Sequence, residues 1–296
     1  MHALIPEPLG DMPGAITYVT VMPDAAPLAD VGFFVPRYMG PVSDMELTRS
    51  MPNLQVIQLL SAGFESALPF VRPGVTLCNA AGVHDASTAE LAVGLIIASL
   101  RHIDDFARAM PLGEWRYDRH AALADKRVVI VGAGGVAKAI ARRLEPFETD
   151  VLLVGRTARP GVHGRDELFT LLPTADVIVL AVPLDEQTRG LVDATFLRQV
   201  PDGALVVNMA RGPVVVTDDL VVEVASGRLR AAMDVTDPEP LPPDHPLWRL
   251  PGVLISPHVG GNTSAFLPRA RRLVATQLAA WQAGEPLENV VAAPRT

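Results

Sequence analysis

The sequence contains a single cysteine, Cys78, among 296 residues. One cysteine excludes an internal disulfide and is typical of a protein from a reducing compartment. The sequence also lacks paired cysteines, the HExxH pattern and other recognised ligand spacings, so we expect no metal site and no metal-dependent hydrolase. Acidic residues outnumber basic ones, and the net charge of −8 argues against nucleic-acid binding, which normally requires a basic face.

Long hydrophobic runs are missing as well. The longest hydrophobic run, Leu91 to Leu100, has about half the length that a membrane span needs. The first residues, Met1-His2-Ala3, lack the basic segment and apolar core of a secretory signal. We therefore expect a cytoplasmic protein with no membrane partner. Because 49% of the residues are hydrophobic and the length suits two ordinary domains, the chain can bury a sizeable core.

A strand, a glycine-rich turn and a helix are predicted in succession between Val128 and Leu144. The apolar run Val128–Val131 has the length and β-branching of a buried parallel strand. The next six residues fit G-x-G-x-x-A: Gly132 allows the tight turn, Gly134 lets a pyrophosphate approach the backbone, and Ala137 lets the helix lie close to the strand. The helix N-terminus offers free N–H groups to phosphates. This order of elements predicts a dinucleotide-binding unit.

Further apolar runs extend this unit on one side and a smaller unit on the other. The fold class that they indicate is α/β, with a Rossmann-type doubly wound parallel sheet inserted into a smaller flavodoxin-like α/β domain. The six strands of the larger sheet are predicted at Val128–Val131, Val151–Val154, Val177–Val182, Ala204–Val207, Ala231–Val235 and Val253–Ile255. Those of the smaller domain are predicted at Ile16–Val21, Val31–Val35, Leu54–Leu60 and Val75–Cys78.

Two helices define the expected domain boundaries. One runs from Ala86 to about Met110 and is apolar on nearly every face as far as Leu100, so it packs between domains or against a second subunit. The other begins at Thr263 and is expected to cross back over the N-terminal domain. We therefore predict a discontinuous domain of residues 1–100 and 263–296, with a dinucleotide-binding domain of residues 101–262 inserted in it. We also expect a homodimer formed through the helix around Ala89–Leu100.

The choice between NAD and NADP depends on the end of the second strand of the larger sheet. In an NAD-binding unit an acidic residue at this place binds the ribose hydroxyls, but here the strand ends in Gly155-Arg156-Thr157. Arg156 and Arg159 can neutralise a 2′-phosphate, and Thr157 can donate a hydrogen bond to it. The pattern favours NADP(H), and NAD(H) stays possible if Arg156 only stacks on the adenine.

Polar segments follow the last three strands of the larger sheet. They contain Arg211, Glu239 and His258, and the carboxyl ends of parallel strands share one edge, where ligands bind. Each residue alone also fits an ordinary role, as a surface charge, a solvated acid or a satisfied histidine. Their succession after neighbouring strands predicts a catalytic site. In the smaller domain, the turn Ser61-Ala62-Gly63 could bind a carboxylate through backbone N–H groups, although taken alone it reads as an ordinary turn.

An ordered set of motifs resembles the D-isomer-specific 2-hydroxyacid dehydrogenase family over about Gln58 to Val290. The set consists of SAGF, NAAG, STAEL, GEW, the glycine turn, AVPLDEQTRGLVD, NMARG, DVTDPEPLP, HPLW and SPHVGG. Within this family, the Gly-Arg-Thr sequence after the second strand is similar to that of NADPH-dependent glyoxylate and hydroxypyruvate reductases. The missing acid at this strand end departs from the usual pattern and puts NAD use in question.

The resemblance implies a role for each of several residues. Arg211, Glu239 and His258 would form a catalytic trio, with Arg211, Ala62 and Gly63 binding the carboxylate of a small 2-oxo acid. Asp234 would hold the nicotinamide carboxamide, and Pro183 and Thr188 would line the cofactor cleft. The other expected cofactor contacts are Gly132, Gly134, Gly135, Val136, Arg156, Thr157, Arg159, Val182, Met209, Ala210, His258 and Gly260.

The chemistry of a 2-oxo acid reductase suits these residue types. Hydride transfer to C2 develops negative charge on the carbonyl oxygen, and His258 can supply the proton while Glu239 fixes its tautomer. Arg211 can orient both the carbonyl and the carboxylate. Two alternatives stay open at this point: a dinucleotide-sensing scaffold of the corepressor type, and phosphite or formate oxidation on the same fold. We expect the side-chain pocket near Tyr38, Phe64, His84 and Trp115.

Overall fold

The computed structural model describes residues 1–18 and 28–292 and divides into two compact units. The first unit consists of Met1–His84 and Thr263–Thr296, and the second of Asp85–Asn262. The second unit is thus an insertion in the first, and its C-terminal boundary lies where we predicted it. The N-terminal boundary differs from the predicted one near residue 100, because the helix that begins at Asp85 packs on the sheet of the second unit.

The first unit is built on a six-stranded sheet in the order β12-β5-β4-β3-β1-β2. All neighbours are parallel except β12 and β5, and the order β2-β1-β3-β4-β5 is that of flavodoxin-like folds, as predicted. The strands are β1 (His2–Pro6), β2 (Ala15–Tyr18), β3 (Val31–Phe34), β4 (Val56–Gln58), β5 (Thr76–Cys78) and β12 (Val290–Ala292).

The predicted strands of this unit overlap four of those six, and residues 19–21 of the predicted strand Ile16–Val21 lie outside the described residues. Neither β1 nor β12 was predicted. Although short and closed by Pro6, β1 lies inside the sheet between β2 and β3, and most of its residues are buried. Its five residues give too short a pattern for periodicity alone to identify.

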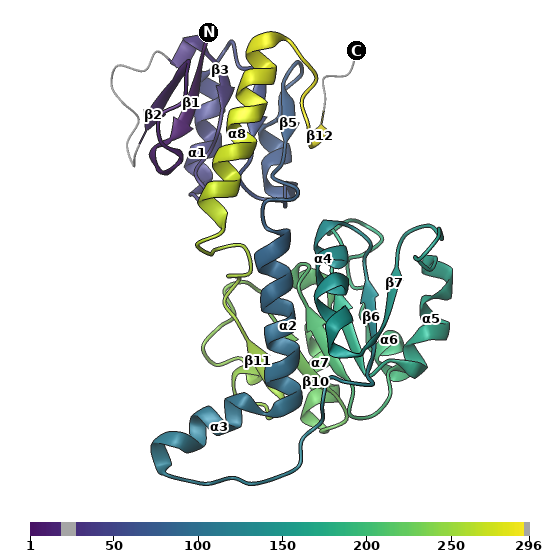
Figure 1. Ribbon diagram of the computed structural model, residues 1–296. Coiled ribbons are helices and arrows are strands. Elements are labelled where there is room, and N and C mark those ends of the chain that lie inside the picture. The colour runs from purple at the N-terminus through teal and green to yellow at the C-terminus, as the bar shows by residue number, and fades with distance from the viewer. Residues whose placement is uncertain (19–27, 293–296) are drawn as a thin grey trace. The chain divides into compact units, whose positions relative to one another are not determined.

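Helix α8 (Phe266–Ala283) covers a face of this first sheet (Figure 1). Phe266, Ala270, Val274 and Leu278 recur every fourth residue and are buried in one cluster with residues of β1, β3 and β4. The helix ends at Gly284, whose φ of +69° is typical of a C-terminal glycine. Among the described residues of this unit, the other α-helix is the short α1 (Val42–Glu46).

The second unit contains a six-stranded parallel sheet in the order β11-β10-β9-β8-β6-β7. The six predicted strands are all present, with ends that differ by up to two residues. They are β6 (Arg127–Val131), β7 (Asp150–Val154), β8 (Val177–Leu180), β9 (Leu205–Asn208), β10 (Arg230–Met233) and β11 (Val253–Ile255). After β6 the chain adds β7 on one side and then β8 to β11 on the other, so the switch point of this doubly wound fold lies between β6 and β8.

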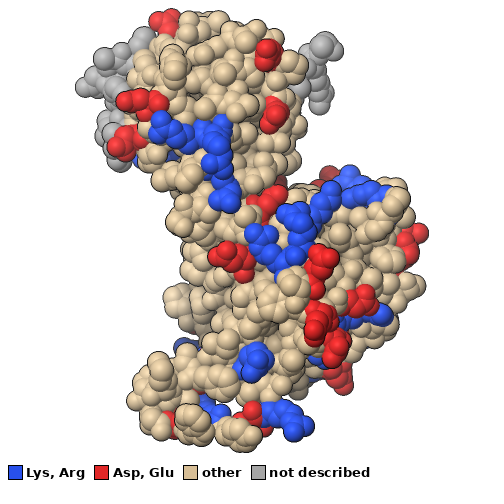
Figure 2. Space-filling view, viewed as in Figure 1, with Lys and Arg blue, Asp and Glu red and all other residues tan. Residues whose placement is uncertain are grey.

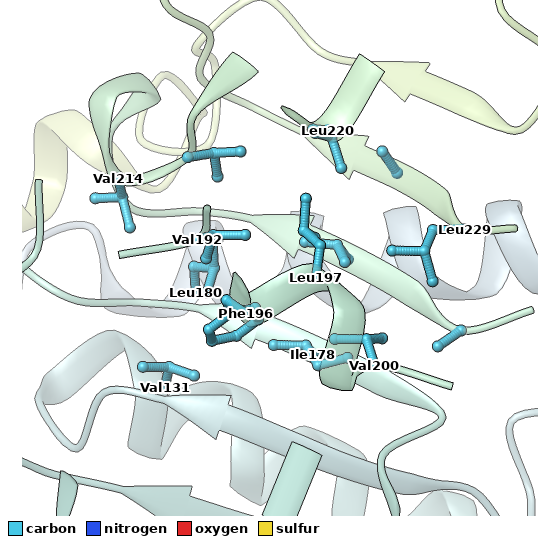
Figure 3. Packing of buried hydrophobic residues seen from close by; sticks show 14 of the residues in the cluster. Val131, Ile178, Leu180, Val192, Phe196, Leu197, Val200, Val214, Leu220 and Leu229 are labelled. Atoms are coloured by element: carbon cyan, nitrogen blue, oxygen red, sulfur yellow. The ribbon is translucent and has the colours of Figure 1, made fainter. Parts of the chain in front are cut away.

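Alternate residues of these strands belong to two separate cores. Val128 and Ile130 of β6 pack with α2 (Asp85–Arg101) and α4 (Gly135–Leu144) on one face. Val129 and Val131 pack in the second core, which Figure 3 shows with Phe196 and Leu197 lying over the sheet. That second core is closed by α5 (Leu168–Leu171), α6 (Ala194–Gln199) and α7 (Thr217–Ala225). The four inner strands β6, β8, β9 and β10 are therefore buried on both faces, as their continuous apolar sequence predicts, whereas the edge strands β7 and β11 are only partly buried.

The helix predicted from Ala86 to Met110 is broken at His102. This residue has a φ of +52° and separates α2 from α3 (Ile103–Ala109), with a bend of 66° between the two segments. In Figure 1, α3 and the segment after it project away from the rest of the second unit. Among the described residues no single helix is long and apolar enough to cross a membrane, and this bent pair passes such a test only when its two parts are combined.

Candidate active site

A cavity of about 260 Å³ lies at the switch point of the second unit. Its walls come from the carboxyl ends of three neighbouring strands: Val131 and Gly132 after β6, Val154 and Gly155 after β7, and Ala181 and Val182 after β8. This is the place where doubly wound sheets bind dinucleotides. Among the residues predicted for the cofactor, the cavity is lined by Gly132, Gly134, Arg156, Arg159, Val182, Pro183 and Thr188.

The glycine turn at the mouth of this cavity is fixed by its backbone. Gly132 has a φ of +136°, and a side chain there would overlap the carbonyl of Ala181. Gly134 is the N-cap residue of α4, so the first N–H groups of this ten-residue helix point out of its N-terminus. A cofactor pyrophosphate fits such a helix end, because it needs hydrogen-bond donors and positive potential.

Three arginines line the cavity, and one carboxylate lies among them. Arg156 donates from Nη2 to Oδ2 of Asp185 at 2.9 Å, and Arg159 donates from Nη2 to the carbonyl of Ala133 at 3.3 Å. The third arginine, Arg165, donates from Nη2 to the carbonyl of Gln187 at 2.7 Å. Neither Arg165 nor Asp185 was predicted from the sequence, since their positions in the chain give no sign of contact with the end of β7.

Asp185 is fixed by a turn of its own. Its Oδ1 accepts from the N–H groups of Gln187 and Thr188, each at 2.9 Å, and the Thr188 hydroxyl lies 3.1 Å from the same oxygen. Partial burial opposes ionisation of this carboxyl, but the hydrogen bonds from Gln187 and Thr188 and the charge of Arg156 outweigh it and lower the pKa of Asp185. Charges of both signs also lie close together elsewhere on the visible face of the second unit (Figure 2).

The structure brings two members of the predicted trio into contact at the same edge of the sheet. Nδ1 of His258, after β11, lies 2.5 Å from Oε1 of Glu239, after β10. Both side chains are about one third exposed, so the pair is open to a ligand. Among the described residues, this is the only hydrogen bond between members of the trio.

The loop that carries His258 is held by Asp234. Oδ1 of this buried carboxylate accepts from the Ser256 hydroxyl at 2.6 Å and from the Val259 N–H, and Oδ2 accepts from the Gly260 N–H, both at 2.9 Å. His258 itself has a φ of +53°, which is uncommon for a residue with a side chain, and its N–H donates to the carbonyl of Asp234. These bonds over-determine the backbone that positions the imidazole.

Arg211 lies in the loop after β9. Asn208 fixes this loop, since its Nδ2 donates to the carbonyl of Arg211 at 3.0 Å and its Oδ1 accepts from the Ala210 N–H at 3.0 Å. The Arg211 guanidinium donates to the carbonyl of Ala210 at 2.7 Å. The next residue, Gly212, is so close to the chain after β10 that a side chain there would overlap the carbonyl of Thr236. The loops of Arg211 and Glu239 are therefore in backbone contact.

In the first unit, the Ser61-Ala62-Gly63 turn is ordered by side chains. The Ser61 hydroxyl donates to the carbonyl of Gly63, and Asn79 Nδ2 donates to the carbonyl of Ala62, each at 2.7 Å. Among the described residues, no acceptor is bonded to the N–H groups of Ala62 and Gly63. The turn can therefore present two N–H donors to an anion.

The residues expected to form the side-chain pocket have different environments. Tyr38 and His84 stack with ring centroids 5.2 Å apart, and both pack on Phe266 within the first unit. His84 is further fixed by a contact of 2.7 Å between its Nε2 and the carbonyl of Leu60. Phe64 is half-buried, whereas Trp115 belongs to the second unit and is 93% exposed.

Comparisons of the sequence and of the structure with known proteins all match proteins of one family. Residues 93–260 match the family model of the D-isomer specific 2-hydroxyacid dehydrogenase NAD binding domain. The human glyoxylate reductase/hydroxypyruvate reductase is 35% identical over 251 residues, which cover 80% of this chain and 76% of the human protein. A glyoxylate reductase from Thermofilum pendens is 33% identical over 258 residues, with 82% and 76% of the two chains covered. Among solved structures, an NADPH-dependent glyoxylate/hydroxypyruvate reductase from Sinorhizobium meliloti, in complex with NADP and sulfate, has a TM-score of 0.85 at 26% identity and covers 98% of each chain.

Proposed function

Since the chain belongs to the D-isomer-specific 2-hydroxyacid dehydrogenase family, we propose that it reduces a small 2-oxo acid with NADPH and that His258 donates the proton. Membership makes the protein an NAD(P)-dependent oxidoreductase. The similar proteins named glyoxylate and hydroxypyruvate reductases support glyoxylate and hydroxypyruvate as the substrates to test first.

The contact between Glu239 and His258 is the observation that carries the proposed chemistry. With Nδ1 bonded to the carboxylate, Nε2 is the ring nitrogen that can give a proton to the carbonyl oxygen of the substrate. When bound, NADPH would supply the hydride for C2, and the product would be the 2-hydroxy acid. Arg211 would pair with the substrate carboxylate and carbonyl, and the N–H groups of Ala62 and Gly63 would bind the carboxylate. Asp234, beside fixing the His258 loop, would hold the nicotinamide carboxamide.

The cofactor preference is proposed from the arginines of the cavity. No acid follows β7, and Arg156 and Arg159 are placed to pair with a 2′-phosphate, which carries about −1.5 to −2 charges. Thr157 is exposed beside them and would add a hydrogen-bond donor. Gly135, Val136, Met209, Ala210 and Gly260 would complete the cofactor contacts from α4 and from the ends of β9 and β11.

Arg156→Ala is expected to raise the KM for NADPH about tenfold or more while the KM for NADH changes little. The variant removes a charge-assisted hydrogen bond that only the 2′-phosphate can make, and such bonds contribute about 1.5–3 kcal/mol. The measurement is kcat/KM for both cofactors with glyoxylate and hydroxypyruvate. Arg198→Ala, an exposed arginine of α6 outside the cavity, is the matched control. A wild-type preference for NADH would overturn the cofactor proposal, and absence of turnover with every 2-oxo acid would overturn the reductase proposal.

A homodimer is proposed on a different segment from the one that the sequence suggested. Most apolar residues of Ala89–Leu100 are buried within the second unit, so few are available to a partner. The segment after them instead exposes large apolar side chains, which a second copy of the chain would cover. They are Ile103, Phe106, Met110, Leu112, Trp115 and Tyr117.

Met110→Glu combined with Leu112→Glu is expected to convert this dimer to a monomer, because each charge would be buried without a partner in the interface. Sedimentation velocity of the wild type and the double variant measures the change. Val222→Glu introduces the same charge at a residue of α7 that is 65% exposed, and it should leave the dimer intact. A monomeric wild-type protein, or a double variant that stays dimeric, would contradict the proposed interface.

A further inference from the structure

We propose that Asp185 limits the preference of this enzyme for NADPH by competing with the 2′-phosphate for Arg156. The inference rests on the proposed use of NADPH. Asp185 is the only carboxylate among the described residues that line the cavity, and it holds the arginine that the 2′-phosphate needs. A carboxylate at this position acts against the phosphate twice, since it occupies the arginine and repels a dianion.

The two oxygens of Asp185 have separate functions. Oδ1 organises the turn through the N–H groups of Gln187 and Thr188, whereas Oδ2 accepts the hydrogen bond from Arg156. The turn keeps the carboxylate in place whether or not the arginine is present. Asparagine at position 185 retains an oxygen for the turn, and an uncharged amide NH2 group, which cannot accept from Arg156, replaces the second oxygen. The substitution therefore separates the competing charge from the local fold.

The side chains of Arg156 and Asp185 differ in how freely they can move. The Arg156 side chain is 71% exposed, while that of Asp185 is 33% exposed and anchored by its turn. Because the pKa of Asp185 is lowered, its carboxylate stays charged at any neutral assay pH. The arginine is thus the partner that can rotate between two acceptors, the fixed carboxylate and a bound 2′-phosphate. NADH lacks the phosphate and can bind without breaking the Arg156–Asp185 pair.

Asp185→Asn is expected to lower the KM for NADPH about two- to fivefold, the range that loss of one exposed competing ion pair allows. The KM for NADH should change less, so the ratio of the two kcat/KM values increases. Glu186→Gln removes the same charge from the adjacent residue, which is exposed and does not line the cavity, and it should change neither value. In the background of Arg156→Ala, the effect of Asp185→Asn on NADPH should be lost or much reduced, since its main target is gone.

Calorimetric binding of adenosine 2′,5′-bisphosphate and of 5′-AMP separates this inference from the proposed function. Asp185→Asn should tighten binding of the bisphosphate two- to fivefold and leave 5′-AMP binding nearly unchanged. If the wild type prefers NADH but this selective gain is still observed, the NADPH proposal fails and the role of Asp185 stands. Equal changes for both nucleotides, weaker bisphosphate binding in Asp185→Asn, or an undiminished gain in the Arg156→Ala background would each overturn the inference.

Discussion

His258→Ala is expected to lower kcat for 2-oxo acid reduction by about 10²–10⁴, the usual contribution of a positioned general acid. The variant removes the group that protonates the carbonyl oxygen, but it leaves the cavity between β6, β7 and β8 unchanged. The affinity for NADPH, measured by fluorescence titration, should therefore stay close to the wild-type value. The expected result is therefore a large loss of kcat together with an almost constant Kd for NADPH.

A second histidine–glutamate pair provides the control for this experiment. His163 Nδ1 lies 2.8 Å from Glu167 Oε2 in the same unit, but the pair does not line the cavity and is not at the ends of β9, β10 or β11. His163→Ala should leave kcat within about twofold of the wild type, because surface pairs of this kind contribute little. If His258→Ala retained more than a tenth of the wild-type kcat, proton donation by His258 would be refuted.

The sheet of the second unit could be predicted from the sequence because each of its strands is identifiable locally. Runs such as Val177–Val182 and Val253–Ile255 are apolar and β-branched, and buried parallel strands require such runs. The contact between Glu239 and His258 was also accessible, since both residues follow neighbouring strands of one parallel sheet. The sheet topology alone predicts that the two residues are close in space, because strand ends at one edge of a parallel sheet lie together whatever their separation in the chain.

Features that depend on long-range packing could not be predicted in the same way. The apolar pattern of Asp85–Arg101 indicates a buried helix, but the same pattern would fit packing on either domain, and only the contacts with α4 and β9–β11 decide it. The pair Arg156–Asp185 joins residues 29 positions apart on two loops. An exposed arginine and an aspartate in a turn are each ordinary, so no local signal indicates that they meet.

The break in the helix at His102 is another feature that the sequence did not predict. The residues on both sides of it are helical, and a single residue with a φ of +52° ends α2 and redirects α3. Such a conformation is unusual for a residue with a side chain and follows from tertiary context rather than from propensity. The consequence is functional, because it places the exposed apolar side chains from Ile103 to Tyr117 away from the core, where we propose that a second copy binds.

Gly212→Ala is expected to reduce kcat/KM by about 10² or more, although residue 212 contributes no side chain to the chemistry. Gly212 follows Arg211, and a Cβ atom at this position would overlap the backbone carbonyl of Thr236, which cannot rotate out of the way as a side chain could. The loops of Arg211 and Glu239 would have to separate, and a misplacement of about 1 Å in an active site can cost about a hundredfold in rate. The same overlap should destabilise the fold by about 1–3 kcal/mol, as overpacking usually does.

Gly94→Ala is the matched control for this substitution, since it adds the same methyl group to the same unit. Gly94 lies in the middle of α2, where an added Cβ atom would meet no atom within 4 Å apart from its neighbours in the same helix, and alanine there should increase stability by about 0.5–1 kcal/mol. Thermal unfolding and kcat/KM measured on both variants test the argument together. The decisive comparison is activity at a temperature where Gly212→Ala is still fully folded, because a loss of rate there must come from displaced loops. Wild-type activity of Gly212→Ala under these conditions would show that the backbone contact does not position Arg211 relative to Glu239.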